Sequence, residues 1–247
     1  MTTLFISDLH LEGARPDIAD QFFEFLRGEA AGADALYILG DLFESWVGDD
    51  DPDEHYAMVK QALRALATGG TPVYFMHGNR DFMIGQRFAA ESAVTLLADP
   101  LMLRIEGTEV LLSHGDSMCT DDIEYQQFRQ MTRNPAWQAM MLQKPLAERL
   151  AFARQARAAS MQRGATLNPV ISDVNQGAVE ALMRKHGTTQ LLHGHTHRPA
   201  VHEFLLDGKP ATRMVLGDWY EQGSVVRWDR HGPRLEFLPR KKGVEPI

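Results

Sequence analysis

The order of hydrophobic and polar residues predicts short buried strands that alternate with amphipathic helices. Five apolar runs lack the alternation of a half-exposed strand, as is typical of strands buried on both faces. They are TLFIS (3–7), ALYIL (35–39), PVYFM (72–76), EVLLS (109–113) and TQLLH (189–193). Between the early runs, apolar residues repeat at helical spacing, at positions 22, 25 and 26 and again at 59, 63 and 66. This alternation predicts an α/β layered core.

The C-terminal part of the chain has a different pattern. Three apolar segments, TRMVLGDW (212–219), GSVVRWD (223–229) and PRLEFLP (233–239), follow one another with short turns between them. Segments joined in this way are typical of antiparallel strands. We therefore expect them to form a second sheet or to extend the first.

Length and composition favour one globular domain over residues 1–247. The chain has 44% hydrophobic and 23% charged residues, enough for a large core. Its net charge of -8 argues against broad nucleic-acid binding, and the single cysteine, Cys119, rules out an internal disulfide. The N-terminal segment has no basic region before its apolar run, which Asp8 interrupts, so we expect no signal peptide and a cytoplasmic protein.

Charge is distributed unevenly along the chain. Residues 125–165 carry seven basic side chains and the single acid Glu148, a charge of +6 that leaves -14 for the rest. Pro135 and Pro145 predict the starts of two helices in this segment. We expect a helical insertion at 120–168 that stands over one edge of the core, at the active site. We interpret the acidic run DDDPDE (49–54) as a solvated loop.

Each of the five buried runs is followed by residues that can ligate a metal. They are Asp8 and His10, Asp41, Asn79, His114, and finally His195 and His197. Strand ends of a layered α/β fold gather at one crevice. Carboxylate, imidazole and amide ligands without thiolate suit Mn²⁺, Mg²⁺, Fe²⁺ or Zn²⁺. Seven ligands are too many for one ion but fit two ions that share a bridging carboxylate.

Each piece of this pattern also has an ordinary structural interpretation. A lone Gly-Asp such as Gly40-Asp41 is a common turn, and Asp8 alone could cap a helix. A single histidine after a strand, such as His77 or His193, is more often a hydrogen-bonded core residue. All five pieces in this order, each after an apolar strand, predict a metal centre.

The order of these motifs resembles the calcineurin-like metallophosphoesterases over nearly the whole chain. The resemblance implies a β-sandwich of two mixed sheets flanked by helices, with two divalent ions at one edge. Asp8, His10 and His197 would hold one ion. Asn79, His114 and His195 would hold the other, with Asp41 as the bridge. Two ions about 3.5–4 Å apart activate a water for in-line attack at phosphorus.

Arg80 indicates which phosphoester is cleaved. Many members of the family have histidine at this position, where it can protonate a departing alkoxide. Arginine stays protonated and cannot act as an acid, but its planar fork can clamp phosphate oxygens. A phosphate monoester, with a second pKa of about 6, leaves with little help. Arg80 therefore favours cleavage of a pyrophosphate over an alkyl phosphomonoester.

Longer motifs narrow the resemblance to the UDP-2,3-diacylglucosamine diphosphatases of lipid A biosynthesis. These motifs are FISDLHLE, GDLFESWVGDDD, HGNRDFMIG, LSHGDSMCTDD, SDVNQGAVE and HGHTHRPAVH. The resemblance implies hydrolysis of UDP-2,3-diacylglucosamine at the α-phosphorus, with Mn²⁺ as the metal. It also implies a peripheral protein on anionic lipids at the cytoplasmic face of the inner membrane. We expect a monomer.

The resemblance also assigns roles to residues. The catalytic set would be Asp41, Asn79, Arg80 and His195. Substrate contacts would come from Asn79, Arg80, Asp122, Ser160 and His195. This chain has Gly164 and Leu167 where the family has an asparagine and a lysine, so Arg157 or Arg163 would replace those contacts.

Two alternatives remain at this point. The apolar residues of the insertion, such as Phe128, Trp137 and Phe152, could simply pack against the core or could line a cleft for acyl chains. A soluble nucleotide or dinucleoside-polyphosphate pyrophosphatase would use the same metal site. A non-catalytic interaction module should have lost several ligands, whereas all seven are present.

Overall fold

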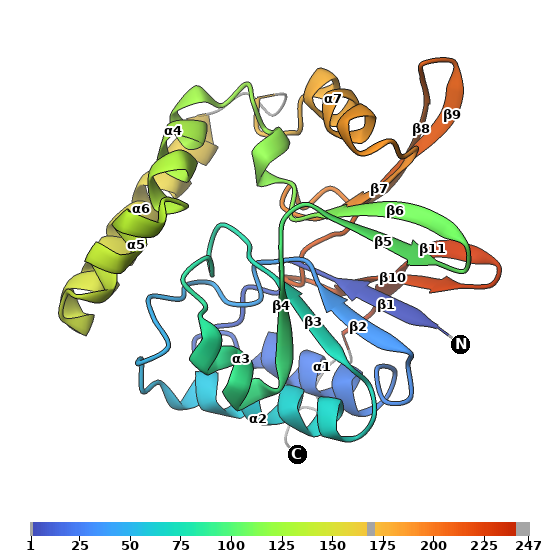
Figure 1. Cartoon of the computed structure of the whole chain (residues 1–247). Helices are drawn as coiled ribbons and strands as arrows, with labels where there is room; N and C mark the ends of the chain where they lie inside the picture. The colour runs from blue at the N-terminus through green and yellow to red at the C-terminus, as the bar shows by residue number, and fades with distance from the viewer. Residues whose placement is uncertain (1, 167–170, 241–247) are drawn as a thin grey trace.

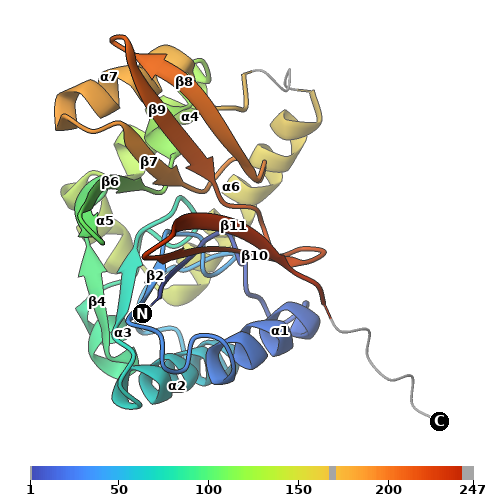
Figure 2. The ribbon, with the colours of Figure 1, turned by 90° about the vertical axis from the view of Figure 1, so that its right-hand side faces the viewer.

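Two mixed β-sheets lie face to face and carry helices on their outer faces (Figures 1 and 2). The computed structural model describes residues 2–166 and 171–240. The first sheet has the order β11-β10-β1-β2-β3-β4, with β1 to β4 parallel. Its strands are β1 (Thr3–Ile6), β2 (Ala35–Ile38), β3 (Val73–Met76), β4 (Val94–Leu97), β10 (Gly223–Asp229) and β11 (Gly232–Leu238).

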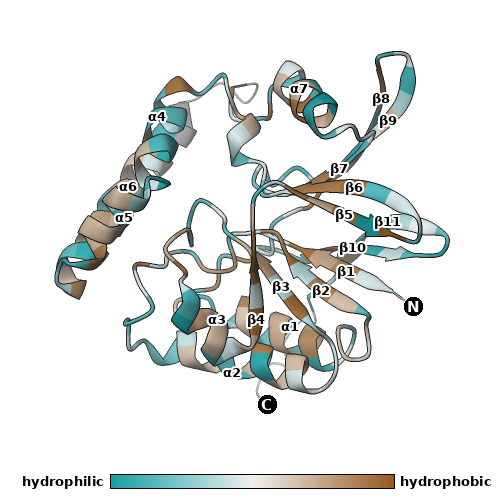
Figure 3. Ribbon diagram, viewed as in Figure 1, coloured by the Kyte–Doolittle hydropathy of each residue, from teal (hydrophilic) through white to brown (hydrophobic). Residues whose placement is uncertain are grey.

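The second sheet has the order β5-β6-β7-β9-β8, with β6, β7 and β9 parallel. Its strands are β5 (Leu101–Ile105), β6 (Thr108–Ser113), β7 (Gln190–His193), β8 (Ala200–Leu206) and β9 (Lys209–Val215). Figure 3 shows hydrophobic residues along β3, β4 and β6, where the sheets face other layers. The expected fold class, two mixed sheets flanked by helices, is confirmed.

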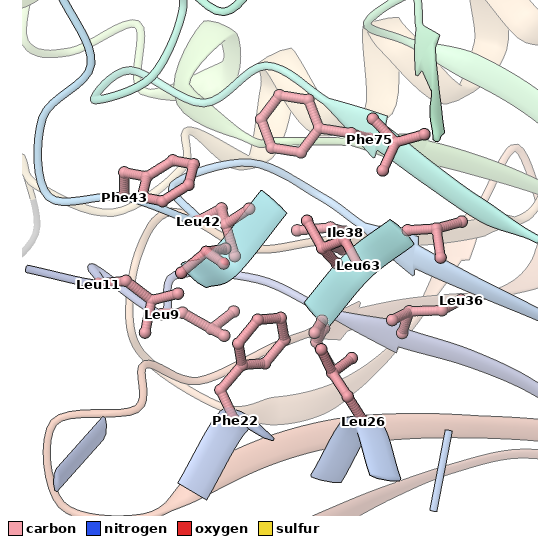
Figure 4. Packing of buried hydrophobic residues seen from close by; sticks show 14 of the residues in the cluster. Leu9, Leu11, Phe22, Leu26, Leu36, Ile38, Leu42, Phe43, Leu63 and Phe75 are labelled. Atoms are coloured by element: carbon pink, nitrogen blue, oxygen red, sulfur yellow. The ribbon is translucent and has the colours of Figure 1, made fainter. Parts of the chain in front are cut away.

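Buried hydrophobic clusters join these layers. Helices α1 (Pro16–Arg27), α2 (Glu54–Thr68) and α3 (Gln86–Ser92) cover the first sheet, and α7 (Gln176–His186) covers the second. Figure 4 shows Phe22 and Leu26 of α1 beside Leu63 of α2, against Ile38 of β2. The apolar positions predicted to lie on one helix face are thus buried, because a 3.6-residue period places them toward the sheet.

The C-terminal strands match the expectation in part, since β10 and β11 are antiparallel and extend the first sheet. The segment 212–219 and the segment 223–229 are not antiparallel neighbours. β9 pairs in parallel with β7 in the second sheet, whereas β10 and β11 form a hairpin that extends the first sheet. The chain crosses between the sheets after β9, at Leu216–Gly217, where Leu216 still donates to the carbonyl of His193.

Helices α4 (Ile123–Thr132), α5 (Pro135–Leu142) and α6 (Leu146–Thr166) form the insertion and stand beside the core (Figure 1). Two of them begin next to a proline, as predicted: Pro135 is the first residue of α5, and α6 starts directly after Pro145. The boundary at 168 stays a prediction, because it lies outside the described residues.

The acidic run 49–54 is not only a solvated loop. The Asp49 carboxylate accepts from the indole of Trp46 and from the backbone amides of Gly85 and Phe88. Asp50 accepts from Arg149 of α6, whose guanidinium also donates to the carbonyl of Val47 at 2.7 Å. The run therefore fastens the insertion to the core.

Candidate metal centre

All seven predicted ligands lie at one edge of the two sheets. Those after β1, β2 and β3 come from the first sheet, and those after β6 and β7 come from the second. Six of them form two groups, and within each group the potential ligand atoms lie within 4.8 Å of one another. One group is Asp8, His10 and His197, and the other is Asp41, His114 and His195.

The first group has the geometry of a cation site. The Nε2 atoms of His10 and His197 are 3.1 Å apart, and Nε2 of His197 is 3.4 Å from Oδ1 of Asp8. That oxygen is buried and accepts no hydrogen bond from any described residue. An uncompensated buried carboxylate oxygen is expensive. A divalent cation at this point would compensate it, so the residues fit the group that the fold implies.

The seventh predicted ligand, Asn79, lies with the second group, because its amide oxygen is close to both histidines of that group. This oxygen lies 2.9 Å from Nε2 of His114 and 2.8 Å from Nδ1 of His195. Oδ2 of Asp41 is 3.8 Å from Nε2 of His114 and 3.9 Å from Nε2 of His10. Asp41 therefore lies between the two groups, as a bridging ligand must.

The electrostatics of the site are dominated by buried carboxylates. Burial opposes a charge on His114, but Asp41, Asp116 and Asp8 outweigh it and raise the pKa of His114 to about 9. Burial and the charge on His114 together lower the pKa of His195 to about 3. One imidazole thus takes up a proton to balance the carboxylates while its neighbour stays neutral. A metal cation would provide that balance instead.

Five of the seven ligand residues have a left-handed backbone. Their φ values lie between 52° and 71°, and the residues are Asp8, His10, Asp41, His195 and His197. Non-glycine residues rarely adopt this conformation, and they concentrate at functional sites when they do. Glycine is needed nearby: a Cβ on Gly78 would overlap the Asp41 carboxylate, and one on Gly194 would overlap Asp8.

Asp81 positions two of the ligand loops, although it was not predicted as a site residue. Its buried carboxylate accepts from the backbone amides of Gly78 at 2.8 Å and Leu42 at 2.7 Å. It thus ties the loop of Asn79 to the loop of Asp41. Burial, with Asp41 next to it, raises the pKa of Asp81 to about 7. Its signal in the sequence is the last position of the Gly-Asn-x-Asp motif.

A cavity of about 980 Å³ opens from the ligands under the insertion. The predicted contacts Arg80, Asp122, Ser160, Arg157 and Arg163 all line it, together with Asn79 and His195. Further side chains of the walls are apolar, among them Phe128, Trp137, Met141, Leu150 and Phe152.

The polar side chains of the cavity are partly engaged. Asp122 caps α4 by accepting from the amide of Tyr125, and it also binds Arg163. Nε of Arg157 is 2.5 Å from Oε1 of Glu44. Gly164 lies in the last turn of α6, whereas Leu167 lies outside the described residues.

Comparison with known proteins agrees with this geometry. The model of the calcineurin-like phosphoesterase family matches residues 1–199. A UDP-2,3-diacylglucosamine hydrolase of Stenotrophomonas maltophilia (strain K279a) is 52% identical over 98% of this chain and 100% of its own length. One from Xanthomonas axonopodis pv. citri (strain 306) is 53% identical over 96% of this chain and 99% of its own length. These relatives confirm the resemblance found in the longer motifs.

Solved structures add evidence on the fold alone. An archaeal phosphodiesterase structure superposes with a TM-score of 0.50 at 12% identity, covering 96% of this chain and 100% of that chain. Fold, ligand geometry and relatives thus agree, and the chain belongs to the calcineurin-like phosphoesterase family.

Proposed function

We propose that this protein hydrolyses the pyrophosphate bond of UDP-2,3-diacylglucosamine at the α-phosphorus, giving UMP and 2,3-diacylglucosamine 1-phosphate for lipid A biosynthesis. The observation that carries the proposal is a pair of candidate metal sites, joined at Asp41, that opens into a large cavity under the insertion. The relatives named UDP-2,3-diacylglucosamine hydrolase support the choice of substrate.

The proposed cofactor is a pair of Mn²⁺ ions. Asp8, His10 and His197 would hold one, Asn79, His114 and His195 the other, with Asp41 shared. Mixed oxygen and imidazole ligands without thiolate suit Mn²⁺, Mg²⁺, Fe²⁺ or Zn²⁺, and the resemblance to the diphosphatase family is the reason for choosing Mn²⁺. When bound, two such ions lower the pKa of a water and neutralise charge on phosphoryl oxygens.

Arg80 is the proposed clamp for the pyrophosphate. It lines the cavity next to Asn79, and its amide donates to Oδ1 of Asp41 at 2.8 Å. Its buried Nε has no hydrogen-bond partner among the described residues. An unpaired buried donor is costly, and a phosphate oxygen would satisfy it. Because Arg80 keeps its proton, the departing sugar phosphate must leave without an acid from this residue.

The apolar wall of the cavity is the proposed site for the acyl chains. Phe128, Trp137 and Phe152 have neighbouring rings, with centroids 5.5 Å apart for the last two. These rings face the cavity rather than the core, which supports an acyl-binding role over simple packing. Each buried methylene contributes about 0.8 kcal/mol, so a few methylenes of each chain suffice for strong selection.

An assay of substrate choice tests the proposal. Detergent-dispersed UDP-2,3-diacylglucosamine should be cleaved to UMP with kcat/KM about 100-fold above UDP-N-acetylglucosamine and dinucleoside polyphosphates, since about four buried methylenes account for that factor. Asp41→Asn protein is the control for contaminating activity. Equal or faster cleavage of the soluble nucleotides would instead identify a nucleotide pyrophosphatase.

The charge of the cavity predicts an effect of Arg157. We expect Arg157→Ala to raise KM for the lipid substrate about tenfold, because a charge-assisted hydrogen bond contributes about 1.5–3 kcal/mol. Arg163→Ala should have a smaller effect, because two acids, Asp122 and Glu124, hold that guanidinium, whereas Arg157 pairs with one acid, Glu44. Arg184→Ala on α7, where the arginine pairs with Glu180 and Asp207, is the matched control. Unchanged kinetics for both cavity variants would remove them from the substrate site.

A peripheral position on anionic lipid of the inner membrane, at its cytoplasmic face, is part of the proposal. Large apolar side chains are exposed on the insertion, including Ile123, Met140, Leu142 and Met161. Among the described helices, none has the length and hydrophobicity needed to cross a bilayer. Cosedimentation with vesicles that contain anionic phospholipid, in a larger fraction than with neutral vesicles, is the expected result. The monomeric state stays a prediction.

A further inference from the structure

The two groups of metal ligands are supported from different parts of the molecule. In the first group, the Nε2 atoms of the two histidines face each other, and their Nδ1 atoms contact carboxylates. Nδ1 of His10 is 3.0 Å from Glu44, and Nδ1 of His197 is 3.5 Å from Asp218. The ring of Tyr220 stacks on His10 at 5.3 Å. Glu44, Asp218 and Tyr220 all belong to loops of the core, and the contact of the insertion with this set comes from Arg157 of α6, which pairs with Glu44.

The second group is supported by the insertion. Asp116 follows His114 by two residues and is fully buried. Its Oδ2 accepts from Nε of Arg129 at 2.9 Å and from the hydroxyl of Tyr125 at 3.0 Å, and it lies 3.5 Å from Nη2 of Arg133. Tyr125 and Arg129 belong to α4, and Arg133 is its C-cap. One core carboxylate thus holds three side chains of the insertion.

Two of these side chains continue to the ligands. The ring of Tyr125 stacks on the imidazole of His195, with centroids 5.7 Å apart and planes at 29°. Nη2 of Arg133 donates at 2.9 Å to the carbonyl of Gly78, the residue before Asn79. Arg133 is itself held over the ring of Phe82. The contacts of α4 reach His195 and the loop of Asn79, both in the second group.

We infer that Asp116 and Arg133 are positioning residues for the metal site of Asn79, His114 and His195, and that α4 of the insertion supports this site alone. The inference rests on the proposed pair of metal sites but not on the proposed lipid substrate. Asn79 is a neutral ligand, so its contribution depends on accurate placement of its loop. Loss of an outer partner of a ligand typically lowers metal affinity about 10–100-fold.

The test is a calorimetric titration of metal-free protein with Mn²⁺. Wild-type protein should bind two ions. Arg133→Met and Asp116→Asn should each weaken one ion about 10–100-fold and leave the other at its wild-type affinity. Anomalous scattering from crystals grown at limiting Mn²⁺ should place the remaining ion at Asp8, His10 and His197. Asp218→Asn should give the reverse, with the remaining ion at Asn79.

Further variants separate positioning from general damage. Arg133→Lys keeps a cationic donor for the carbonyl of Gly78 and should recover most of the lost affinity. Arg184→Met removes an exposed arginine of α7 and should bind both ions normally. If Asp116→Asn does not fold, Arg133→Met decides the question alone.

The outcomes distinguish this inference from the proposed function. Wild-type protein that binds no Mn²⁺ would contradict the proposed function. Wild-type protein with two ions, and Arg133→Met with both at unchanged affinity, would overturn the inference only. Equal weakening of both ions by Arg133→Met would also overturn it, because that result indicates a general structural role.

Discussion

Asp41→Asn should lower kcat for the lipid substrate about 10³-fold or more. The asparagine keeps the oxygen that accepts from the amide of Arg80 but removes the negative charge between the two ligand groups. Charge stabilisation by a metal pair contributes several kcal/mol to such reactions, and each 1.36 kcal/mol is a factor of ten. Steady-state kinetics at saturating Mn²⁺ measures the effect.

The control experiment for this variant tests whether it still folds. The substitution is isosteric and removes a buried charge next to Asp81, so metal-free variant and metal-free wild type should melt at similar temperatures. A variant that folds normally and retains more than about a tenth of wild-type kcat would contradict a bridging role for Asp41.

Removal of metal should abolish turnover and also lower stability. After dialysis against EDTA we expect activity at the uncatalysed background, restored by Mn²⁺. An ion present at 100 times its Kd stabilises the folded state by about 2.7 kcal/mol. For a chain of this size that corresponds to about 5–10 °C in Tm. Calorimetric melting curves with and without Mn²⁺ measure the shift.

Asp41→Asn provides the comparison for this experiment, since its Tm should respond less to Mn²⁺ than that of wild type. Turnover that persists in excess EDTA, with no change in Tm on addition of Mn²⁺, would rule out the two-metal scheme. A shift in Tm on addition of Mn²⁺, without recovery of activity, would show that the protein binds metal but does not hydrolyse the proposed substrate.

The convergence of the candidate ligands could be predicted from sequence because these residues follow the ends of apolar strands. That signal is local, and it needs no knowledge of which strands pair. Strands β4, β5 and β8 were not predicted, because they are only partly buried and their hydrophobic pattern is mixed. The place of β9 was missed because its partner β7 lies elsewhere in the chain and pairs in parallel.

The charged residues of the insertion show a second limit of prediction from sequence. The sequence shows the excess of basic residues but not their partners, and the structure pairs most of them with acids outside the segment 125–165. Arg129 and Arg133 bind Asp116, Arg149 binds Asp50, Arg157 binds Glu44, and Arg163 binds Asp122 and Glu124. Except for the acids near α4, these partners are distant in the sequence from the arginines that they bind. Sequence spacing could not identify them. The same reason hid the role of Glu44, whose partner Arg157 is remote in the sequence.

The left-handed backbone of five ligand residues lowers the stability of the fold at positions that we expect activity to require. Each such residue strains the folded chain by about 1 kcal/mol, which glycine in its place would relieve. When the protein is selected for heat resistance without metal, where no bound ion stabilises the fold, glycine should therefore be tolerated at these positions and yield folded but inactive variants. A useful selection would have to demand turnover and thermal endurance in the same round.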